Sequence, residues 1–217
     1  IVSGSRDETI KIWNLDVKSD NYKYGESIFT LEGHTNYVNS VGFNHNGTKI
    51  VSGSLDKTIR VWNVDEKSEN YGECILTLKG HTDFVNSVGF NHDGTKIVSG
   101  SWDNTIRVWN VDVKSNIYQY GECILTLKGH RSNVLSVGFN HDGTKIVSGS
   151  NDRTIRVWKV DTGEEEKVLK GHTYWVWSVG FNHDGTKIVS GSYDRTIRVW
   201  KVDTGESILT LKGHTGT

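Results

Sequence analysis

The chain has 217 residues, enough for one sizeable domain with a buried core. Its formal net charge of −1, from 25 basic and 26 acidic residues, gives no electrostatic footprint for nucleic acid or an anionic membrane. No apolar run approaches the length needed to span a bilayer. We therefore expect neither a nucleic-acid partner nor a membrane partner.

The two cysteines, Cys74 and Cys123, occupy the same position in successive repeats of the sequence. No other cysteine is available, so a disulfide framework is not expected and a reducing compartment is favoured. No signal peptide is visible in the sequence. These features predict an intracellular, cytoplasmic protein.

A repeated unit runs through the chain. The motif I-V-S-G-S-x-D-x-T-I-[RK]-[VI]-W occurs five times, with its tryptophans 42 to 49 residues apart. L-x-G-H also occurs five times, and V-x-S-V-G-F-N-H-[ND]-G-T-K occurs four times. Self-similarity at this period is typical of arrays in which each repeat is one supersecondary unit.

Each unit predicts four short strands, most clearly in residues 37–79. The alternating run 38–43 is followed by an Asn-Gly turn signal and by a second strand, KIVSGS. A polar turn at Asp56 then leads to TIRVW, which is rich in β-branched residues, and ILTL forms the fourth strand. No segment has a helical period, so the units predict antiparallel sheets repeated radially as propeller blades.

In these Gly-His and Trp motifs the chain resembles the WD-repeat family over nearly its whole length. The resemblance implies an all-β fold, a β-propeller built of four-stranded antiparallel blades. There is one departure, because the residue after each repeated Trp is not the Asp that names the family but one of Asn14, Asn63, Asn110, Lys159 and Lys201. This departure leaves the packing role of the Trp itself intact.

The sequence predicts one propeller domain over residues 1–217, with four complete blades and a partial one. The blades are expected at about residues 1–32 (partial), 37–79, 84–128, 133–170 and 175–212. Seven blades are the common number in the family. We therefore expect further sequence beyond one or both ends to complete such a ring, with closure by self-association as the alternative.

Each complete unit carries a His, a Ser, an Asp and a Trp. The four sets are His34, Ser52, Asp56 and Trp62; His81, Ser99, Asp103 and Trp109; His130, Ser148, Asp152 and Trp158; His172, Ser190, Asp194 and Trp200. Ser, His and Asp together invite a hydrolase interpretation. Four copies of one active site would be redundant, however, and no nucleophile elbow surrounds the Ser. The family resemblance implies structural tetrads, hydrogen-bonded inside each blade, so we expect no catalytic residue and no enzyme.

A second histidine series, His45, His92, His141 and His183, lies beside the turn in N-H-[ND]-G. A ring of metal ligands is conceivable, because His and Asp both bind cations. Copies on separate blades are expected to lie too far apart to share one ion. We therefore expect turn residues here, and neither a metal nor a cofactor.

The copies differ mainly in three places. The first surrounds the Val that opens the first strand: Tyr37, Asn39, Phe84, Asn86, Asn133, Leu135, Trp175 and Trp177. The second precedes the turn Asp: Arg6, Leu55, Trp102, Asn151 and Tyr193. In an antiparallel pair, the first strand starts where the second ends, so both sets are expected on one face. The third lies in loops lengthened by KSDNYKYGE, KSENYGE and KSNIYQYGE, expected on the opposite face as tolerated loop growth or as a second contact site.

Random drift explains variability at these positions but not their many aromatic residues, which are typical of interface anchors. The sequence therefore predicts a non-enzymatic scaffold that binds a protein or peptide, centred on Trp175, Trp177 and Tyr193. The alternative is a ligand-sensing WD-repeat domain of a larger signalling protein, such as a nucleotide-driven switch receptor.

Overall fold

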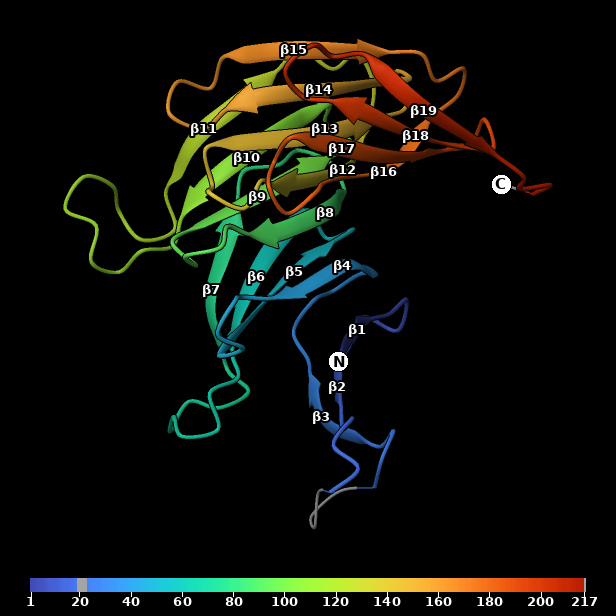
Figure 1. The fold of residues 1–217 in the computed structure, drawn as a ribbon. Helices are drawn as coiled ribbons and strands as arrows, with labels where there is room; N and C mark the ends of the chain where they lie inside the picture. The colour runs from blue at the N-terminus through green and yellow to red at the C-terminus, as the bar shows by residue number, and fades with distance from the viewer. Residues whose placement is uncertain (19–22, 217) are drawn as a thin grey trace.

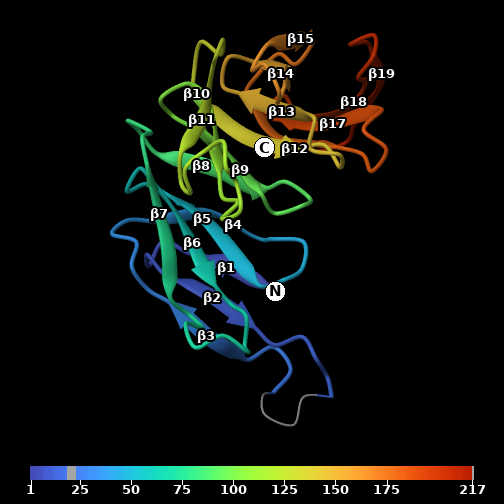
Figure 2. The same ribbon diagram turned by 90° about the vertical axis from the view of Figure 1, so that its left-hand side faces the viewer.

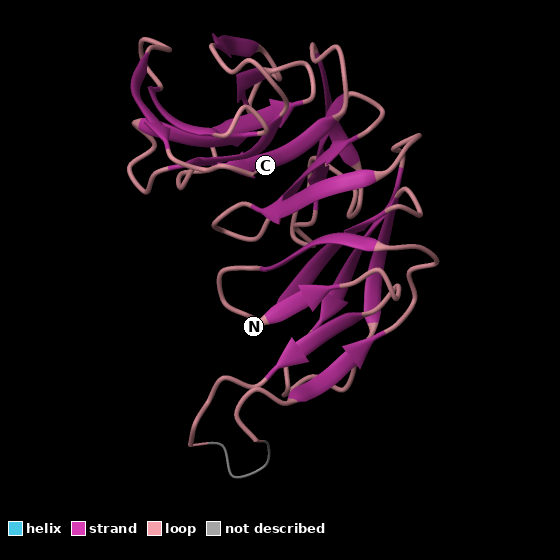
Figure 3. Ribbon diagram, turned by 90° about the vertical axis from the view of Figure 1, so that its right-hand side faces the viewer, coloured by secondary structure: helices cyan, strands magenta, loops and turns pink. Residues whose placement is uncertain are grey.

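The computed structural model describes residues 1–18 and 23–216. Within these residues the chain forms 19 β-strands and no helix (Figure 3). The strands build one three-stranded sheet followed by four four-stranded sheets, each with its strands in chain order. The fold is therefore all-β, with four complete propeller blades and one partial blade.

The bounds of the strands repeat from blade to blade. The first blade contains β1 (Val2–Gly4), β2 (Ile10–Trp13) and β3 (Ser27–Leu31). The second blade contains β4 (Val38–Phe43), β5 (Lys49–Ser54), β6 (Thr58–Asn63) and β7 (Cys74–Lys79). The third contains β8 (Val85–Phe90), β9 (Lys96–Ser101), β10 (Thr105–Asn110) and β11 (Cys123–Lys128). The fourth contains β12 (Val134–Phe139), β13 (Lys145–Ser150), β14 (Thr154–Lys159) and β15 (Glu165–Lys170), and the fifth β16 (Val176–Phe181), β17 (Lys187–Ser192), β18 (Thr196–Lys201) and β19 (Ser207–Lys212).

Local sequence explains the tight turns between these antiparallel strands. In the β4–β5 turn, Gly47 has a positive φ of 73°, a conformation that glycine adopts without steric cost. The Asn46 side chain accepts hydrogen bonds from the backbone and the hydroxyl of Thr48, at 3.2 and 2.6 Å. The later copies use Asp in the same way, as Asp93 does with Thr95.

The hydrophobic core lies between the blades, since each thin sheet has two apolar faces to cover. One such layer joins the second blade to the third: Val51, Ile59, Val61 and Leu78 pack against Val85, Val88, Ile97, Trp109 and Val111. Equivalent layers join the first blade to the second, the third to the fourth and the fourth to the fifth. The tryptophans of the four complete blades are each only 1% exposed within them.

Small side chains set the spacing between neighbouring blades. A Cβ added at Gly53 would lie 2.8 Å from atoms of Val85 and Val88 on the next blade. Serine adds a hydrogen bond at the same interface, where Ser40 Oγ accepts from the Val88 backbone N–H at 3.1 Å. The bond recurs from Val137 to Ser87 and from Val179 to Ser136.

The five blades form an open arc rather than a closed ring. Figure 1 shows the first blade and the fifth blade at opposite ends of the arc, with the other blades between them. The view turned by 90° shows the same separation of blue and red strands (Figure 2). Cys74 and Cys123, which begin β7 and β11, are both unpaired. No helix in the described residues is long and apolar enough to cross a membrane.

The close approach of neighbouring blades predicts different effects on stability for alanine at two equivalent glycines. Gly100→Ala places a Cβ 2.7 Å from Val134 Cγ1 and 2.8 Å from Val137 Cγ1, whereas the equivalent Gly191 has no atom within 4 Å. We expect Gly100→Ala to lower the free energy of unfolding by about 1–3 kcal/mol through overpacking. Gly191→Ala, the matched control, should change it little. Denaturant melts of dilute samples compare the two, and equal midpoints would contradict this account of the interface.

Candidate functional site

The two variable sets of side chains lie beside each other at one end of every complete blade. Four backbone hydrogen bonds of 2.9–3.0 Å join them, from Leu55 N–H to Tyr37 C=O, Trp102 to Phe84, Asn151 to Asn133, and Tyr193 to Trp175. The antiparallel hairpins thus hold the start of the innermost strand against the end of the second. We call this end of the blades the aromatic face.

A β-bulge aims one side chain of each innermost strand at this face. In β4 the pairing with β5 passes from Val38 to Ser40, so that Asn39 has no partner of its own. The same irregularity falls at Asn86, Leu135 and Trp177. Bulges bend the strand locally and re-aim side chains, often beside functional sites. The sequence motif did not reveal these bulges, because V-x-S-V is equally compatible with a regular strand.

One groove of about 490 Å³ opens on the aromatic face. Its lining comes from all five blades and consists of Arg6, Tyr37, Asn39, Leu55, Phe84, Asn86, Trp102, Leu135 and Trp177. Eight of the twelve predicted binding residues therefore share a single concave surface, with Arg6 at one end. We call this surface the aromatic groove.

Within the aromatic groove, apolar rings alternate with amides and one cation. The Phe84 and Trp102 rings pack with centroids 5.1 Å apart. The Asn39 side-chain amide donates to the Asn86 side-chain oxygen at 3.1 Å. Arg6 places its guanidinium carbon 5.8 Å from the centre of the Tyr37 ring, within the range of a cation–π contact. The lining thus offers aromatic surface, amide groups and a positive charge together.

The other four predicted residues, Asn133, Asn151, Trp175 and Tyr193, lie on the aromatic face but outside the described lining of the groove. Tyr193 instead contacts both Trp175 and Trp177, with ring centroids 5.5 and 5.4 Å apart. Tyr174 completes this cluster at 5.1 Å from Trp175. Sequence reasoning missed Tyr174, although it occupies another position that varies between copies, where the earlier repeats have Asn36, Asp83 and Ser132.

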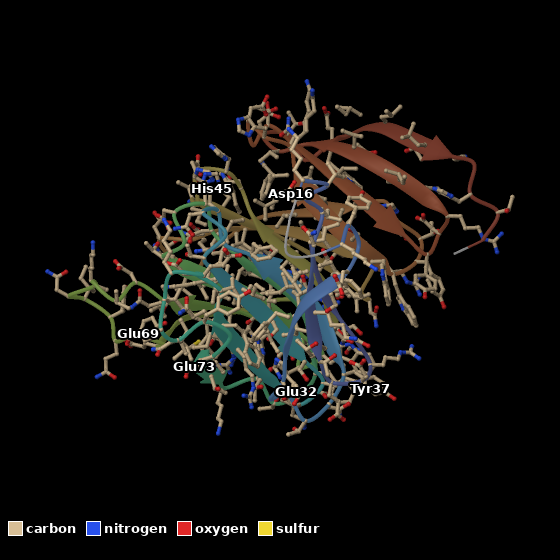
Figure 4. All side chains as sticks on the ribbon, turned by 90° about the horizontal axis from the view of Figure 1, so that it is seen from below. Asp16, Glu32, Tyr37, His45, Glu69 and Glu73 are labelled. Atoms are coloured by element: carbon tan, nitrogen blue, oxygen red, sulfur yellow. The ribbon has the colours of Figure 1, made fainter. Side chains whose placement is uncertain are left out.

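The long loops leave the opposite ends of the strands. Figure 4 shows this polarity, with Tyr37 at one end of β4 and His45 at the other, and with Glu69 on a projecting loop. Residues 19–22 of the first insertion, KSDNYKYGE, lie outside the described residues. A contact role for these insertions therefore stays a prediction.

The His, Ser, Asp and Trp side chains of each complete blade form one hydrogen-bonded chain. In the second blade, His34 Nδ1 lies 2.7 Å from Asp56 Oδ2, and His34 Nε2 lies 2.7 Å from Ser52 Oγ. Trp62 Nε1–H donates to the same Ser52 Oγ at 2.8 Å. A neutral His34 that donates from Nδ1 must accept at Nε2, so the Ser52 hydroxyl donates to it while accepting from Trp62. All four groups are then satisfied at once.

The other three complete blades repeat these contacts. His81, His130 and His172 each lie 2.7–2.8 Å from their Asp and Ser partners. Trp109, Trp158 and Trp200 donate to Ser99, Ser148 and Ser190 at 2.8–2.9 Å. The structure also adds a threonine that the sequence motif had not flagged: Thr58 donates to Asp56 Oδ1 from its hydroxyl at 2.6 Å. The Asp therefore fixes both the histidine ring and the β5–β6 turn.

The Asp carboxylates of these hydrogen-bonded His-Ser-Asp-Trp sets are held in the ionised form. Burial opposes ionisation of Asp56, but hydrogen bonds from His34 and Thr58 outweigh it and lower the pKa of Asp56 well below its usual range. The same balance lowers the pKa of Asp103 and Asp152, and that of Asp194 to about 2. Burial lowers the pKa of His172, and the Asp194 carboxylate opposes this without reversing it. In the fifth blade, the lowered pKa of His172 and of Asp194 favours a neutral histidine between an ionised Asp and a Ser.

The burial of the serine hydroxyl groups distinguishes this arrangement from a catalytic triad. The serines of the four hydrogen-bonded His-Ser-Asp-Trp sets are at most 1% exposed. Each serine Oγ is already hydrogen-bonded to a His and a Trp. A nucleophile must reach the carbonyl carbon of its substrate, which a fully buried hydroxyl cannot do. The geometry fits a role in packing.

The second histidine series corrects an expectation from the sequence. Imidazole centroids lie 4.0 Å apart between His45 and His92, 4.3 Å between His92 and His141, and 4.5 Å between His141 and His183. The expectation that these copies lie too far apart was wrong, because the β4–β5 type turns end the innermost strands, where neighbouring blades are closest. Loss of hydration, together with repulsion from His45 and His141, lowers the pKa of His92. Among the described residues no group of three or more His, Cys, Asp or Glu side chains is arranged to hold a metal.

The comparison with known protein families agrees with the blade architecture described above. The family model "WD domain, G-beta repeat" matches residues 1–14, 25–63, 72–110, 121–159 and 163–201. The chain belongs to the WD40 family. Each full match starts near the outermost strand of one blade and ends with the third strand of the next. A WD40 repeat therefore spans two blades, and it contains one complete His-Ser-Asp-Trp chain.

Among curated proteins, a segment is similar to Lissencephaly-1 homolog 1 of Paramecium tetraurelia, with 47% identity over 47 residues. That match covers 22% of this WD40 chain and 10% of the relative. Its length is about that of one repeat, so it adds to the family assignment and not to a particular activity.

The hydrogen-bonded set of side chains predicts different effects on stability for two histidines of the same repeat. His130→Ala removes a partner from both Ser148 and Asp152, and should cost about 1–3 kcal/mol of unfolding free energy. His141→Ala, the matched control, removes an exposed ring and should change stability by about 0.5 kcal/mol or less. Urea melts of the two variants make the comparison. A His130→Ala midpoint equal to that of wild type would refute the structural role.

Proposed function

We propose that this WD40 chain is a non-enzymatic scaffold that binds an extended peptide, or an exposed loop of a partner protein, in the aromatic groove. The observation that carries the proposal is the lining of that groove. Eight residues chosen because they differ between otherwise matching repeats meet on one concave surface of about 490 Å³. Side chains that only filled space in the framework would repeat from blade to blade.

The chemistry of the groove supports a peptide rather than a small charged metabolite. Trp102 and Trp177, 40% and 55% exposed, offer large rigid surfaces that bury much area for little lost side-chain entropy. The amides of Asn39 and Asn86 can exchange their mutual hydrogen bond for bonds to a peptide backbone. Arg6 adds one cation, which suits a peptide carrying a carboxylate near an apolar side chain.

The alternative is a ligand-sensing WD-repeat domain of a larger signalling protein, such as a nucleotide-driven switch receptor. The described residues hold no feature that favours it over peptide binding. The matched relative spans far more sequence than this chain, so the activity of any whole protein is a separate question.

Two substitutions test the proposal. We expect Trp102→Ala and Trp177→Ala to weaken binding of peptides selected from a displayed random library by about 2 kcal/mol, roughly a thirtyfold rise in Kd. Melting midpoints should stay near that of wild type, because both side chains are substantially exposed. Fluorescence titration with the selected peptides measures the loss.

Tyr24→Ala provides the control, since Tyr24 is 65% exposed on a loop away from the aromatic face. It should bind the selected peptides as wild type does. If both tryptophan variants stay folded and keep wild-type affinity, the aromatic groove is not the binding site.

A further inference from the structure

Every blade closes the connection between its third and fourth strands with the same hydrogen bond, whatever the length of the loop. A glycine N–H donates to the carbonyl of the residue after the repeated Trp at 2.8–3.0 Å: Gly25 to Asn14, Gly72 to Asn63, Gly121 to Asn110, Gly163 to Lys159, and Gly205 to Lys201. These glycines all have φ between 72° and 84°. The residue before each glycine therefore occupies an equivalent position in long and short loops.

That position holds a tyrosine in the three long loops and a threonine in the two short turns. The tyrosines are Tyr24, Tyr71 and Tyr120, and the threonines are Thr162 and Thr204. In the second blade, Tyr71 packs back onto the first blade, with its ring centroid 5.0 Å from that of Phe29 on β3. Tyr71 also contacts the apolar layer between these two blades. It therefore covers the outermost strand of the preceding blade.

The third blade uses its long loop in the same way. A Cβ added at Gly121 would lie 3.0 Å from Leu76 on β7, and Leu76 is the counterpart of Phe29. Burial raises the pKa of the neighbouring Tyr120 hydroxyl. The Tyr-Gly step of the third blade thus lies on the second blade as that of the second lies on the first.

The fourth blade keeps the glycine but not the ring. Gly163 lies over the third blade, where an added Cβ would be 3.2 Å from Leu125, the counterpart of Leu76. Thr162 before it is exposed and has no aromatic group. A cavity of about 510 Å³ opens here between the third and fourth blades, with Ile124, Leu125 and Val160 as its apolar part. Its volume falls within the range of ligand-binding pockets.

Polar groups surround this apolar part of the cavity. Lys145 and Lys159 in the lining are paired with Glu166 at 2.7 Å and Glu164 at 2.9 Å. Lys96 and Asp161, which also line the cavity, form no ion pair with any residue that the structure describes. They offer a donor and an acceptor to polar groups beside a buried ring. An amphipathic ring such as that of tyrosine suits this lining better than a purely apolar one.

We propose that the cavity between the third and fourth blades binds a tyrosine side chain that a partner protein presents on an exposed turn. The chain itself indicates the occupant, because the two preceding interfaces keep a Tyr-Gly step at this position and this one leaves it open. The next interface has Thr204 at the equivalent position, but its floor is Lys167 in place of Leu125. The cavity is separate from the aromatic groove, since it lies at the start of β13 and the end of β14.

A blocked peptide of sequence ENYGE, copied from residues 69–73, is the probe, and ENAGE is its control. In an NMR titration of the full chain, ENYGE should shift the backbone amide signals of Ile124, Leu125 and Val160. ENAGE should bind at least about tenfold more weakly, because it lacks the ring that would be buried. Equal binding of the two peptides, or no shift with ENYGE, overturns the proposal. Shifts confined to the indole N–H signals of Trp102 and Trp177 overturn it too, because they place the peptide in the aromatic groove.

Thr162→Tyr supplies the missing ring within the chain and should compete with the peptide. We expect it to weaken ENYGE binding about tenfold and to raise the urea midpoint, since the new ring packs on Leu125. Thr204→Tyr places the same ring on the matched turn over Lys167, and it should leave ENYGE affinity unchanged. Wild-type affinity of the Thr162→Tyr variant overturns the proposal. An equal loss of affinity in both variants overturns it as well, because the effect would then not depend on filling this cavity.

Discussion

Face-to-face packing of neighbouring blades is the constraint on which the rest of the structure depends. A four-stranded sheet has two apolar faces and cannot bury both by itself, so stability comes from the layers between blades. Glycine at positions such as Gly53 lets the valines of the next blade approach its sheet, and Ser40 hydrogen-bonds across the same gap. The buried tryptophan, anchored through Ser and His to an Asp at the turn, ties each layer to the aromatic face.

This framework leaves two places free to vary, the aromatic face and the long loops at the opposite ends of the strands. The bulged residue and the residue before the turn Asp are the positions that packing does not dictate, and both are held by rigid strands. A site assembled from five blades in this way can change its chemistry one side chain at a time without disturbing the core. The aromatic groove depends on the relative placement of all five blades, so a weaker interface anywhere along the arc would disturb it.

Sequence reasoning reached the blade architecture because the repeat motif fixes strand order, turn positions and the buried tryptophan together. It also placed Tyr37 beside Leu55, since antiparallel pairing alone brings those positions together. It missed the bulge at Asn39 and the stacking of His45 on His92. Both depend on hydrogen-bond register and on the distance between blades, which no single repeat encodes. The sequence did not reveal that Thr58 binds Asp56, because a Thr after the turn is equally compatible with an ordinary strand residue.

The claim that blade-to-blade packing carries the stability is tested most directly by native-state hydrogen exchange on the monomeric chain at low concentration. Amides of β9 and β13, in blades covered on both faces, should exchange only through global unfolding. Amides of β18 and β19 should exchange through a local opening of lower free energy, because one face of the fifth blade is uncovered and leaves Val189 and Leu211 each 47% exposed. Equal protection of all four complete blades would contradict this account, since it would mean that each sheet is held by its own hydrogen bonds and not by its neighbours.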